Sequence, residues 1–113
     1  MWYQLVGVRE YLTDGGGSPF GDWFAGLDGR AAAKVTTVLA RIAAGNFSEV
    51  KGVGGGVFER RIDYGPGYRV CFGKEGKTII VLLGGGTKQR QPRDIEAALG
   101  HWRAYKERRE AKS

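Results

Sequence analysis

The chain of 113 residues has little of what several common functional sites require, since it contains one cysteine and one histidine. A single cysteine excludes an internal disulfide and a cysteine cluster for zinc, so we expect Cys71 to be a buried free thiol. His101 alone supplies neither a histidine-based metal site nor a Ser-His-Asp triad, and we expect it on a helix surface. We therefore expect no metal and no cofactor.

Long hydrophobic runs are also lacking. The longest apolar run covers residues 79–83, far below the roughly 20 residues that span a bilayer. The N-terminal stretch MWYQLVGVREYLTD lacks the basic start, apolar segment and cleavage site of a signal peptide. We expect a cytoplasmic protein that has no membrane partner.

Glycine, in contrast, is abundant, with 20 residues. The runs GVGGG at 52–56 and GGGTK at 84–88 invite comparison with a phosphate-binding loop, which requires G-x-x-x-x-G-K-[ST]. Neither run matches, because Thr87 separates Gly86 from Lys88 and Gln89 stands where the hydroxyl residue should be. We expect these glycines to shape the ends of strands.

The net charge of +6 is concentrated in the C-terminal half. Residues 1–50 hold four Lys and Arg against five acids, whereas residues 51–113 hold fourteen against seven. Such a surface attracts a phosphate backbone or an acidic protein, although a solvated basic face that only aids solubility is an alternative.

The first half of the chain predicts one strand and two helices. Loose alternation predicts a strand over residues 2–8. Ser18 followed by a proline is typical of a helix start, and the spacing of apolar residues predicts a helix from Pro19 to about Leu27. Asp28 is a suitable cap for a second helix, which should end at Gly45. The apolar faces of both helices require a sheet to cover them.

The next forty residues change from helical spacing to alternation, which predicts three antiparallel strands. We expect them at about 57–64, 68–73 and 78–83, with residues 65–68 forming a type II turn. Alternation places Arg60 and Arg61 on opposite faces of the first of these strands. The face with Glu59 and Arg61 is charged, so we expect it to be open to water or to a ligand.

Helical spacing returns from Pro92 to about Lys106, and a polar helix end follows. The predicted order is β-α-α-β-β-β-α, an α+β fold in which the two N-terminal helices pack on a small, mainly antiparallel sheet. The length suits a single domain over residues 1–113, with a core at about 20–102 and a charged tail at 103–113.

Arginines in the stretch RRIDYGPGYRVCF, at 60–72, exceed what a structural hairpin needs. Arg61 and Arg69 are eight apart across the turn, so their side chains can lie close together. Fixed cationic groups of this kind can stabilise the charge on a pentacoordinate phosphorane without a metal ion. The alternative is structural: Arg61 pairs with Glu59 or Asp63, and Arg69 pairs with Asp63.

Several motifs, in order, resemble one family: GNF, V-K-G-V-G-G-G-V, R-I-x-Y-G-P-G-Y-R-V and L-L-G-G-G-x-K. From about residue 20 to 102 the chain is similar to the phage Gp49-like, HigB-type "addiction module killer" branch of the RelE/ParE toxin superfamily. The resemblance implies a RelE-like microbial RNase-type fold. It also implies the toxin of a type II toxin-antitoxin system, which cleaves mRNA on the ribosome by 2′-hydroxyl attack and is neutralised by a helix-turn-helix antitoxin.

Site residues follow from the same resemblance. It implies that Arg61, Arg69 and Lys88 act on the scissile phosphate, and that Lys51, Tyr68 and Arg90 bind RNA. The chain departs from the cleaving toxins near its C-terminus, where it offers Asp94 and His101 but no tyrosine before position 105. Two alternatives to a nuclease therefore stay open: a ParE-like gyrase inhibitor without hydrolysis, and an inactive member that only binds its antitoxin.

Overall fold

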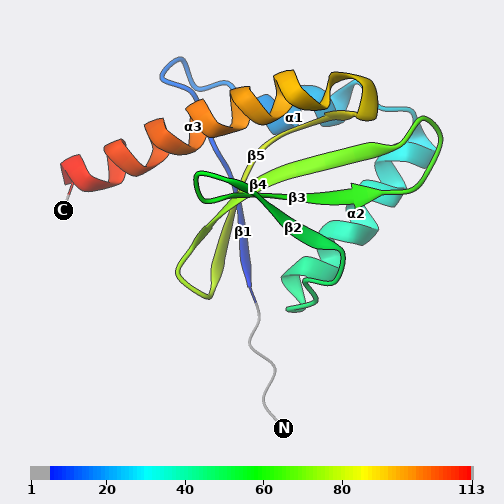
Figure 1. Cartoon of the computed structure of the whole chain (residues 1–113), viewed down its shortest axis with the longest axis horizontal. Coiled ribbons are helices and arrows are strands. Elements are labelled where there is room, and N and C mark those ends of the chain that lie inside the picture. The colour runs from blue at the N-terminus through cyan, green and yellow to red at the C-terminus, as the bar shows by residue number, and fades with distance from the viewer. Residues whose placement is uncertain (1–5, 113) are drawn as a thin grey trace, which may run out of the picture.

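A computed structural model describes residues 6–112 and shows an α+β fold, in which three helices cover a five-stranded mixed sheet (Figure 1). The α+β class predicted from the sequence is confirmed. The elements, in chain order, are β1 (Gly7–Glu10), α1 (Pro19–Ala25), α2 (Gly29–Ala43), β2 (Val50–Gly54), β3 (Val57–Ile62), β4 (Tyr68–Glu75), β5 (Ile79–Thr87), a short 3-10 helix η1 (Lys88–Arg90) and α3 (Gln91–Lys112).

The N-terminal helices begin where their capping residues predict. The Ser18 hydroxyl accepts a hydrogen bond from the Gly21 amide at 2.9 Å, and the Asp28 carboxylate accepts one from Ala31 at the same distance. Helix α1 ends at Ala25, slightly earlier than expected. Helix α2 is capped at Ala44, and the next residue, Gly45, has a φ of 89°, a conformation that favours glycine.

The sheet has the order β1-β5-β4-β3-β2, in which β1 and β5 are parallel and all other neighbours are antiparallel. Strand β2 was not predicted, because its two glycines lower its strand propensity. The first strand was predicted at 2–8, of which residues 2–5 lie outside the described part. Because β2 pairs with β3, it brings its lysine alongside the arginines of the hairpin.

The turn between β3 and β4 was predicted one residue too late. Its closing hydrogen bond runs from the Gly67 amide to the Tyr64 carbonyl, so the turn covers residues 64–67. Gly65 and Gly67 both have positive φ, at 55° and 82°, where a side chain would be strained. The hairpin itself is as expected, with Arg61 directly opposite Arg69.

Strand β5 runs through the three glycines that were expected to end it. A Cβ at Gly85 would lie 2.3 Å from the Trp23 ring, and a Cβ at Gly86 would lie 1.9 Å from the Asp94 carboxylate. The prediction was wrong because Gly85 and Gly86 leave room for side chains that cross the strand, whereas no atom lies within 4 Å of a Cβ at Gly84. Gly85 and Gly86 are packing positions within the sheet.

Two hydrophobic clusters lie on opposite faces of the sheet. Helices α1 and α2 cover one face, where Val35 and Ile42 meet Phe72 and their neighbours. Helix α3 covers the other through Ala98 and Trp102. The charged face expected on β3 is therefore only partly open, because Val57 and Glu59 on that face are buried.

Helix α3 continues through the residues that were expected to form a charged tail. Tyr105 donates a hydrogen bond to Glu75 at 2.5 Å, and Arg109 forms an ion pair with the same carboxylate at 2.7 Å. Arg108 donates a hydrogen bond to the Leu12 carbonyl. These contacts attach the C-terminal half of α3 to β4 and to the segment after β1. Within residues 6–112, no helix is long and apolar enough to cross a membrane.

Candidate anion-binding site

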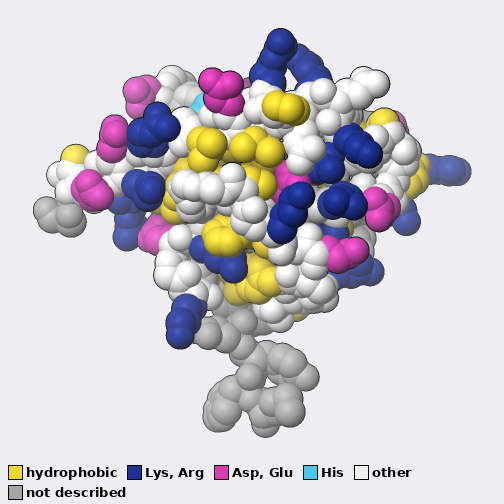
Figure 2. Space-filling model, in the orientation of Figure 1, with side chains coloured by type: hydrophobic (Ala, Val, Ile, Leu, Met, Phe, Trp, Pro, Cys, Tyr) yellow, Lys and Arg dark blue, Asp and Glu magenta, His cyan; other side chains and the backbone are white. Residues whose placement is uncertain are grey.

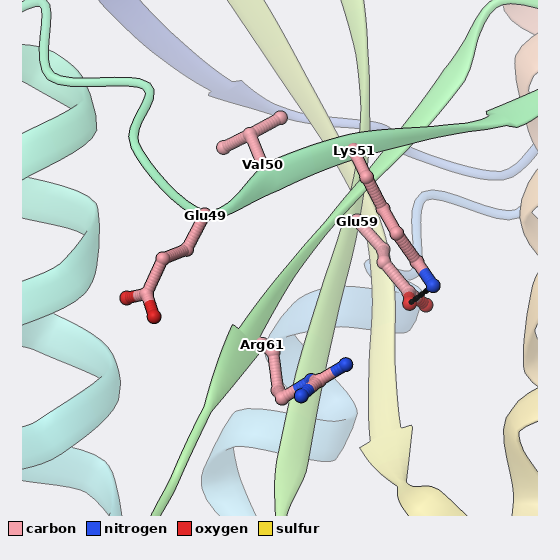
Figure 3. Close-up of a pocket in the computed structure, with 5 residues that line it drawn as sticks. All are labelled: Glu49, Val50, Lys51, Glu59 and Arg61. Carbon is pink, nitrogen blue, oxygen red and sulfur yellow. Dashed lines mark ion pairs between the residues drawn. The ribbon is translucent and has the colours of Figure 1, made fainter.

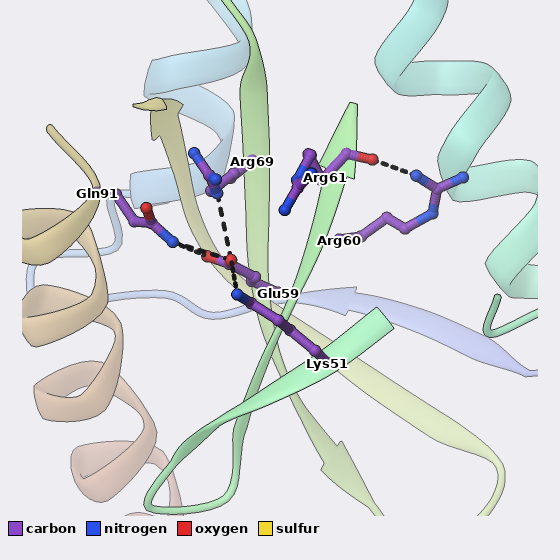
Figure 4. Close-up of polar contacts among 6 residues, drawn as sticks. All are labelled: Lys51, Glu59, Arg60, Arg61, Arg69 and Gln91. Carbon is purple, nitrogen blue, oxygen red and sulfur yellow. Dashed lines mark hydrogen bonds and ion pairs between the residues drawn. The ribbon is translucent and has the colours of Figure 1, made fainter. Parts of the chain in front are cut away.

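The centre of the candidate site is Glu59, a carboxylate that is 1% exposed on β3. Its oxygens accept hydrogen bonds from Arg69 Nε at 3.2 Å and from Gln91 Nε2 at 2.9 and 3.2 Å. Lys51 Nζ lies 3.7 Å from the carboxylate. Figure 4 shows these side chains converging from β2, β4 and the start of α3. We call Lys51, Glu59, Arg69 and Gln91 the Glu59 cluster.

Strand register explains how three cations reach one face of the sheet. Lys51 is directly opposite Glu59, and Arg61 is directly opposite Arg69. Residues in direct register, or two apart on one strand, point to the same face. All four therefore point to the face that α3 covers, near the N-terminal end of that helix. The predicted proximity of Arg61 and Arg69 is confirmed by the strand pairing.

Arg61 differs from the cluster because its side chain is exposed. Its guanidinium makes no hydrogen bond or ion pair to any residue in the described part of the chain. It borders a surface hollow of about 270 Å³ that Lys51 and Glu59 also line (Figure 3). A free guanidinium beside a hollow can bind a phosphate oxygen without first breaking an internal ion pair.

Arg69 is 8% exposed, and only its Nε is bonded to Glu59. Its two terminal amino groups have no partner among residues 6–112. Among residues 6–112, Asp94 Oδ2 is the only fully buried side-chain nitrogen or oxygen atom without a hydrogen-bond partner. The terminal nitrogens of Arg69 also lack a partner, so they are not fully buried and remain in contact with solvent. Arg69 thus combines a fixed position with two unused donor groups.

Arg60 lies on the opposite face, as alternation predicted. Its side chain is 8% exposed and lies 3.5 Å from Glu49. It also donates a hydrogen bond to the Arg61 carbonyl oxygen (Figure 4). The two neighbouring arginines therefore have different environments, one held by the fold and one free.

The remaining residues implied by the family resemblance are more scattered. Lys88 and Arg90 are exposed on η1, directly before Gln91 in the chain, where the Gln91 amide donates a hydrogen bond to the Lys88 carbonyl. Among the described residues, neither basic side chain forms an ion pair with Glu59. Tyr68 is buried on the other face, where its ring meets Trp23 at 6.2 Å. The structure therefore brings Lys51, Arg61 and Arg69 together and leaves Tyr68 apart, so the Tyr68 phenol does not share the face of the cluster.

Candidate acid and base groups lie beside the site or away from it. Asp94 is in the first turn of α3, and burial raises the pKa of its carboxyl above the ordinary value. With Glu59 and Arg69 it lines a narrow gap that has no room for a water molecule. His101 stacks on Tyr11 at 5.0 Å between ring centroids, and burial lowers the pKa of its imidazole.

Sequence reasoning missed the centre of this site. Glu59 was considered only as a structural partner of Arg61, whereas it binds Arg69 and Lys51. Gln91 was not identified, although a polar residue directly before Pro92 marks the start of a helix. Its role depends on a contact across 32 residues of sequence, which no local pattern indicates.

Basic side chains extend beyond the cluster. Figure 2 shows Lys and Arg gathered over the strands on the viewed face, beside the N-terminal end of α3. Exposed Lys88, Arg90 and Arg93 continue the positive charge at that end of the helix. An extended polyanion could contact the hollow and this helix end at the same time.

No family model matches the chain. A protein of Haemophilus influenzae, described only as an uncharacterized protein, is 41% identical over 96 residues, which cover 84% of this chain and 91% of the relative.

Proposed function

The chain belongs to one family with the Haemophilus influenzae protein, and because that relative's description gives no activity, we propose a function from the site itself. We propose that the protein binds RNA at Lys51, Arg61 and Arg69 and cleaves it, as the toxin of a type II toxin-antitoxin system. The observation that carries this proposal is the free Arg61 guanidinium beside the Glu59 cluster.

The chemistry follows from the cations. In RNA, the 2′-hydroxyl loses its proton to water and attacks the adjacent phosphorus, which passes through a pentacoordinate phosphorane with added negative charge. The bond from phosphorus to the 5′-oxygen of the next nucleotide then breaks and that oxygen takes a proton from water, which leaves a 2′,3′-cyclic phosphate and a 5′-hydroxyl. Arg61 and the terminal groups of Arg69 can donate hydrogen bonds to that charge as it develops, and Lys51 adds a third positive charge. Such donors stabilise the transition state more than the substrate, which is the requirement for catalysis.

The family resemblance in the hairpin supports the biological assignment. The motif around Arg69 and the L-L-G-G-G-x-K run before η1 are similar to those of RelE/ParE toxins, for which a sheet that presents basic residues is expected. We propose mRNA on the ribosome as substrate and a helix-turn-helix antitoxin as partner. The antitoxin would neutralise the toxin by covering the basic face.

Expression of the chain alone in bacteria tests this function. We expect growth arrest and new 5′ ends in a reporter mRNA. Arg61→Ala should lower cleavage by about 100-fold, because a donor to the developing charge is lost. Arg30→Ala is the matched control, since Arg30 is exposed on α2 and its side chain forms no hydrogen bond or ion pair with a described residue.

The outcomes separate the alternatives. Growth arrest with intact mRNA and induction of the DNA-damage response would replace the nuclease by a gyrase inhibitor. Normal growth on expression would leave antitoxin binding as the function of the basic face. Equal cleavage by Arg61→Ala and Arg30→Ala would remove Arg61 from the site.

A further inference from the structure

We propose that Glu59 is a positioning residue, which directs Arg69 and Lys51 toward the phosphate without contacting RNA itself. This inference rests on the proposed function and deepens it. Glu59 is 1% exposed and only borders the hollow, and its oxygens already accept hydrogen bonds from Arg69 and Gln91. Its contribution to the reaction therefore acts through the side chains that it holds.

The geometry at Arg69 shows how Glu59 can act. Glu59 binds Nε, the nitrogen nearest the backbone, at 3.2 Å. Figure 4 shows the terminal nitrogens pointing away from the carboxylate. A carboxylate that paired with both terminal groups would occupy the donors that a phosphate needs. Bonding through Nε instead fixes the plane of the guanidinium and leaves both terminal groups available.

Glu59 is itself held from two sides. Gln91 donates to both of its oxygens from the first turn of α3, and Lys51 approaches from β2. The carboxylate therefore has a fixed orientation, set by two elements other than its own strand. A loosely held carboxylate could not fix the direction of Arg69.

Electrostatics gives Glu59 a second role. Arg69 and Lys51 both approach the same carboxylate, and their like charges would repel each other if it were absent. The negative charge of Glu59 allows Lys51 to remain at the hollow and Arg69 to remain beside it. Since Arg61 has no such partner, the site retains a net positive charge for an anion.

Glu59→Gln in the full chain tests this inference, because it keeps the side-chain shape and removes the charge. We expect the rate of cleavage at saturating RNA to fall by about 100-fold, since misplaced reacting groups cost that much. Binding of an RNA with a 2′-deoxy substitution at the cleavage position should stay equal or become tighter, because the site gains positive charge. A purely neutralising role would leave the cleavage rate unchanged, and that result would overturn the proposal.

A double substitution separates positioning from a general structural effect. If Glu59 acts through Arg69, Glu59→Gln should add little to the loss caused by Arg69→Lys, because lysine has no Nε to hold. Additive losses would contradict the proposal. If Glu59→Gln does not fold, Gln91→Ala provides the same test, since it frees the carboxylate on one side and should lower the cleavage rate in the same direction.

An NMR measurement is independent of cleavage and so distinguishes failure of this inference from failure of the proposed function. In the wild type, the Arg69 Nε proton should exchange slowly, and titration with inorganic phosphate should shift the terminal guanidinium signals. In Glu59→Gln, exchange should be at least about five-fold faster, because the bond loses its charge-assisted character. Unchanged exchange would refute the positioning role even if the wild type cleaves RNA, whereas intact mRNA with the wild type would refute only the nuclease.

Discussion

Arg61 and Arg69 lie directly opposite each other on β3 and β4, yet Arg61 is exposed without a partner among residues 6–112 and Arg69 is buried against Glu59. Their shared register places both on one face, and the start of α3 covers only one of them. The two arginines therefore differ in role, since the Arg61 guanidinium is free to bind an anion and the Arg69 guanidinium is fixed in position. This difference leads to opposite expectations for their substitution.

Removal of Arg69 should destabilise the protein, whereas removal of Arg61 should not. Arg69→Ala leaves a buried carboxylate without its main partner, a change that costs about 3–5 kcal/mol. Arg61→Ala removes an exposed side chain and should change the free energy of unfolding by less than about 0.5 kcal/mol. Urea denaturation of the two variants measures both values. Equal stabilities would contradict the buried pairing, and they would also make Arg69→Ala suitable for activity assays.

The salt dependence of RNA binding should report three phosphate contacts. Each neutralised phosphate on a single strand contributes about 0.7 to the slope of log affinity against log salt, so Lys51, Arg61 and Arg69 together predict a slope near −2. Arg61→Ala should reduce its magnitude by about 0.7, and Arg30→Ala should not change it. Fluorescence anisotropy with a non-cleavable RNA measures the slope. A value near zero would show that RNA does not bind through these cations.

Alanine substitutions along β5 should have very different costs. A Cβ at Gly85 would overlap the Trp23 ring, so Gly85→Ala should lose about 1–3 kcal/mol or more of unfolding free energy. Gly84→Ala is the control on the same strand, because no atom lies within 4 Å of a Cβ built there. Thermal unfolding compares the two, and similar midpoints would mean that Trp23 does not pack on the strand as described.

Stability should fall as the pH is lowered through the titration range of His101. Burial lowers the pKa of this imidazole below its ordinary value of 6.5, so the unfolded chain takes up the proton first. The contribution of neutral His101 to the free energy of unfolding is therefore complete above pH 6.5, and it is lost as the pH falls toward the lower pKa of the folded protein. His101→Phe, which keeps the stacking on Tyr11, should flatten this part of the profile. Chemical denaturation between pH 5 and pH 8 tests it, and a wild-type profile that the substitution leaves unchanged would exclude the effect.

Local signals predicted the parts of the fold that depend on neighbouring residues. Ser18 and Asp28 mark helix starts through a hydrogen bond to an amide three residues later, so a short pattern is sufficient. Alternation was equally sufficient to place Arg60 and Arg61 on opposite faces. The same alternation put Glu59 on the face of Arg61 but did not reveal that α3 buries it.

The remaining errors came from contacts between distant residues. Strand β5 continues through Gly85 and Gly86, where Trp23 occupies the space on one face and Asp94 occupies it on the other. Strand β2 was missed because its glycines have low strand propensity, and only its pairing with β3 makes it a strand. The contact between Gln91 and Glu59 likewise joins elements far apart in sequence. Amino-acid composition and the spacing of hydrophobic residues contain no information about contacts between residues far apart in sequence.

Gly85 and Gly86 have a consequence for how relatives of this protein should be aligned. Trp23 approaches the strand at the first position and Asp94 approaches it at the second, from helices on different faces of the sheet. The absence of a side chain at Gly85 leaves space for the Trp23 indole ring, and the absence of one at Gly86 leaves space for the Asp94 carboxyl group. A relative with larger residues at these positions must carry smaller ones at 23 and 94, so the four columns should vary together.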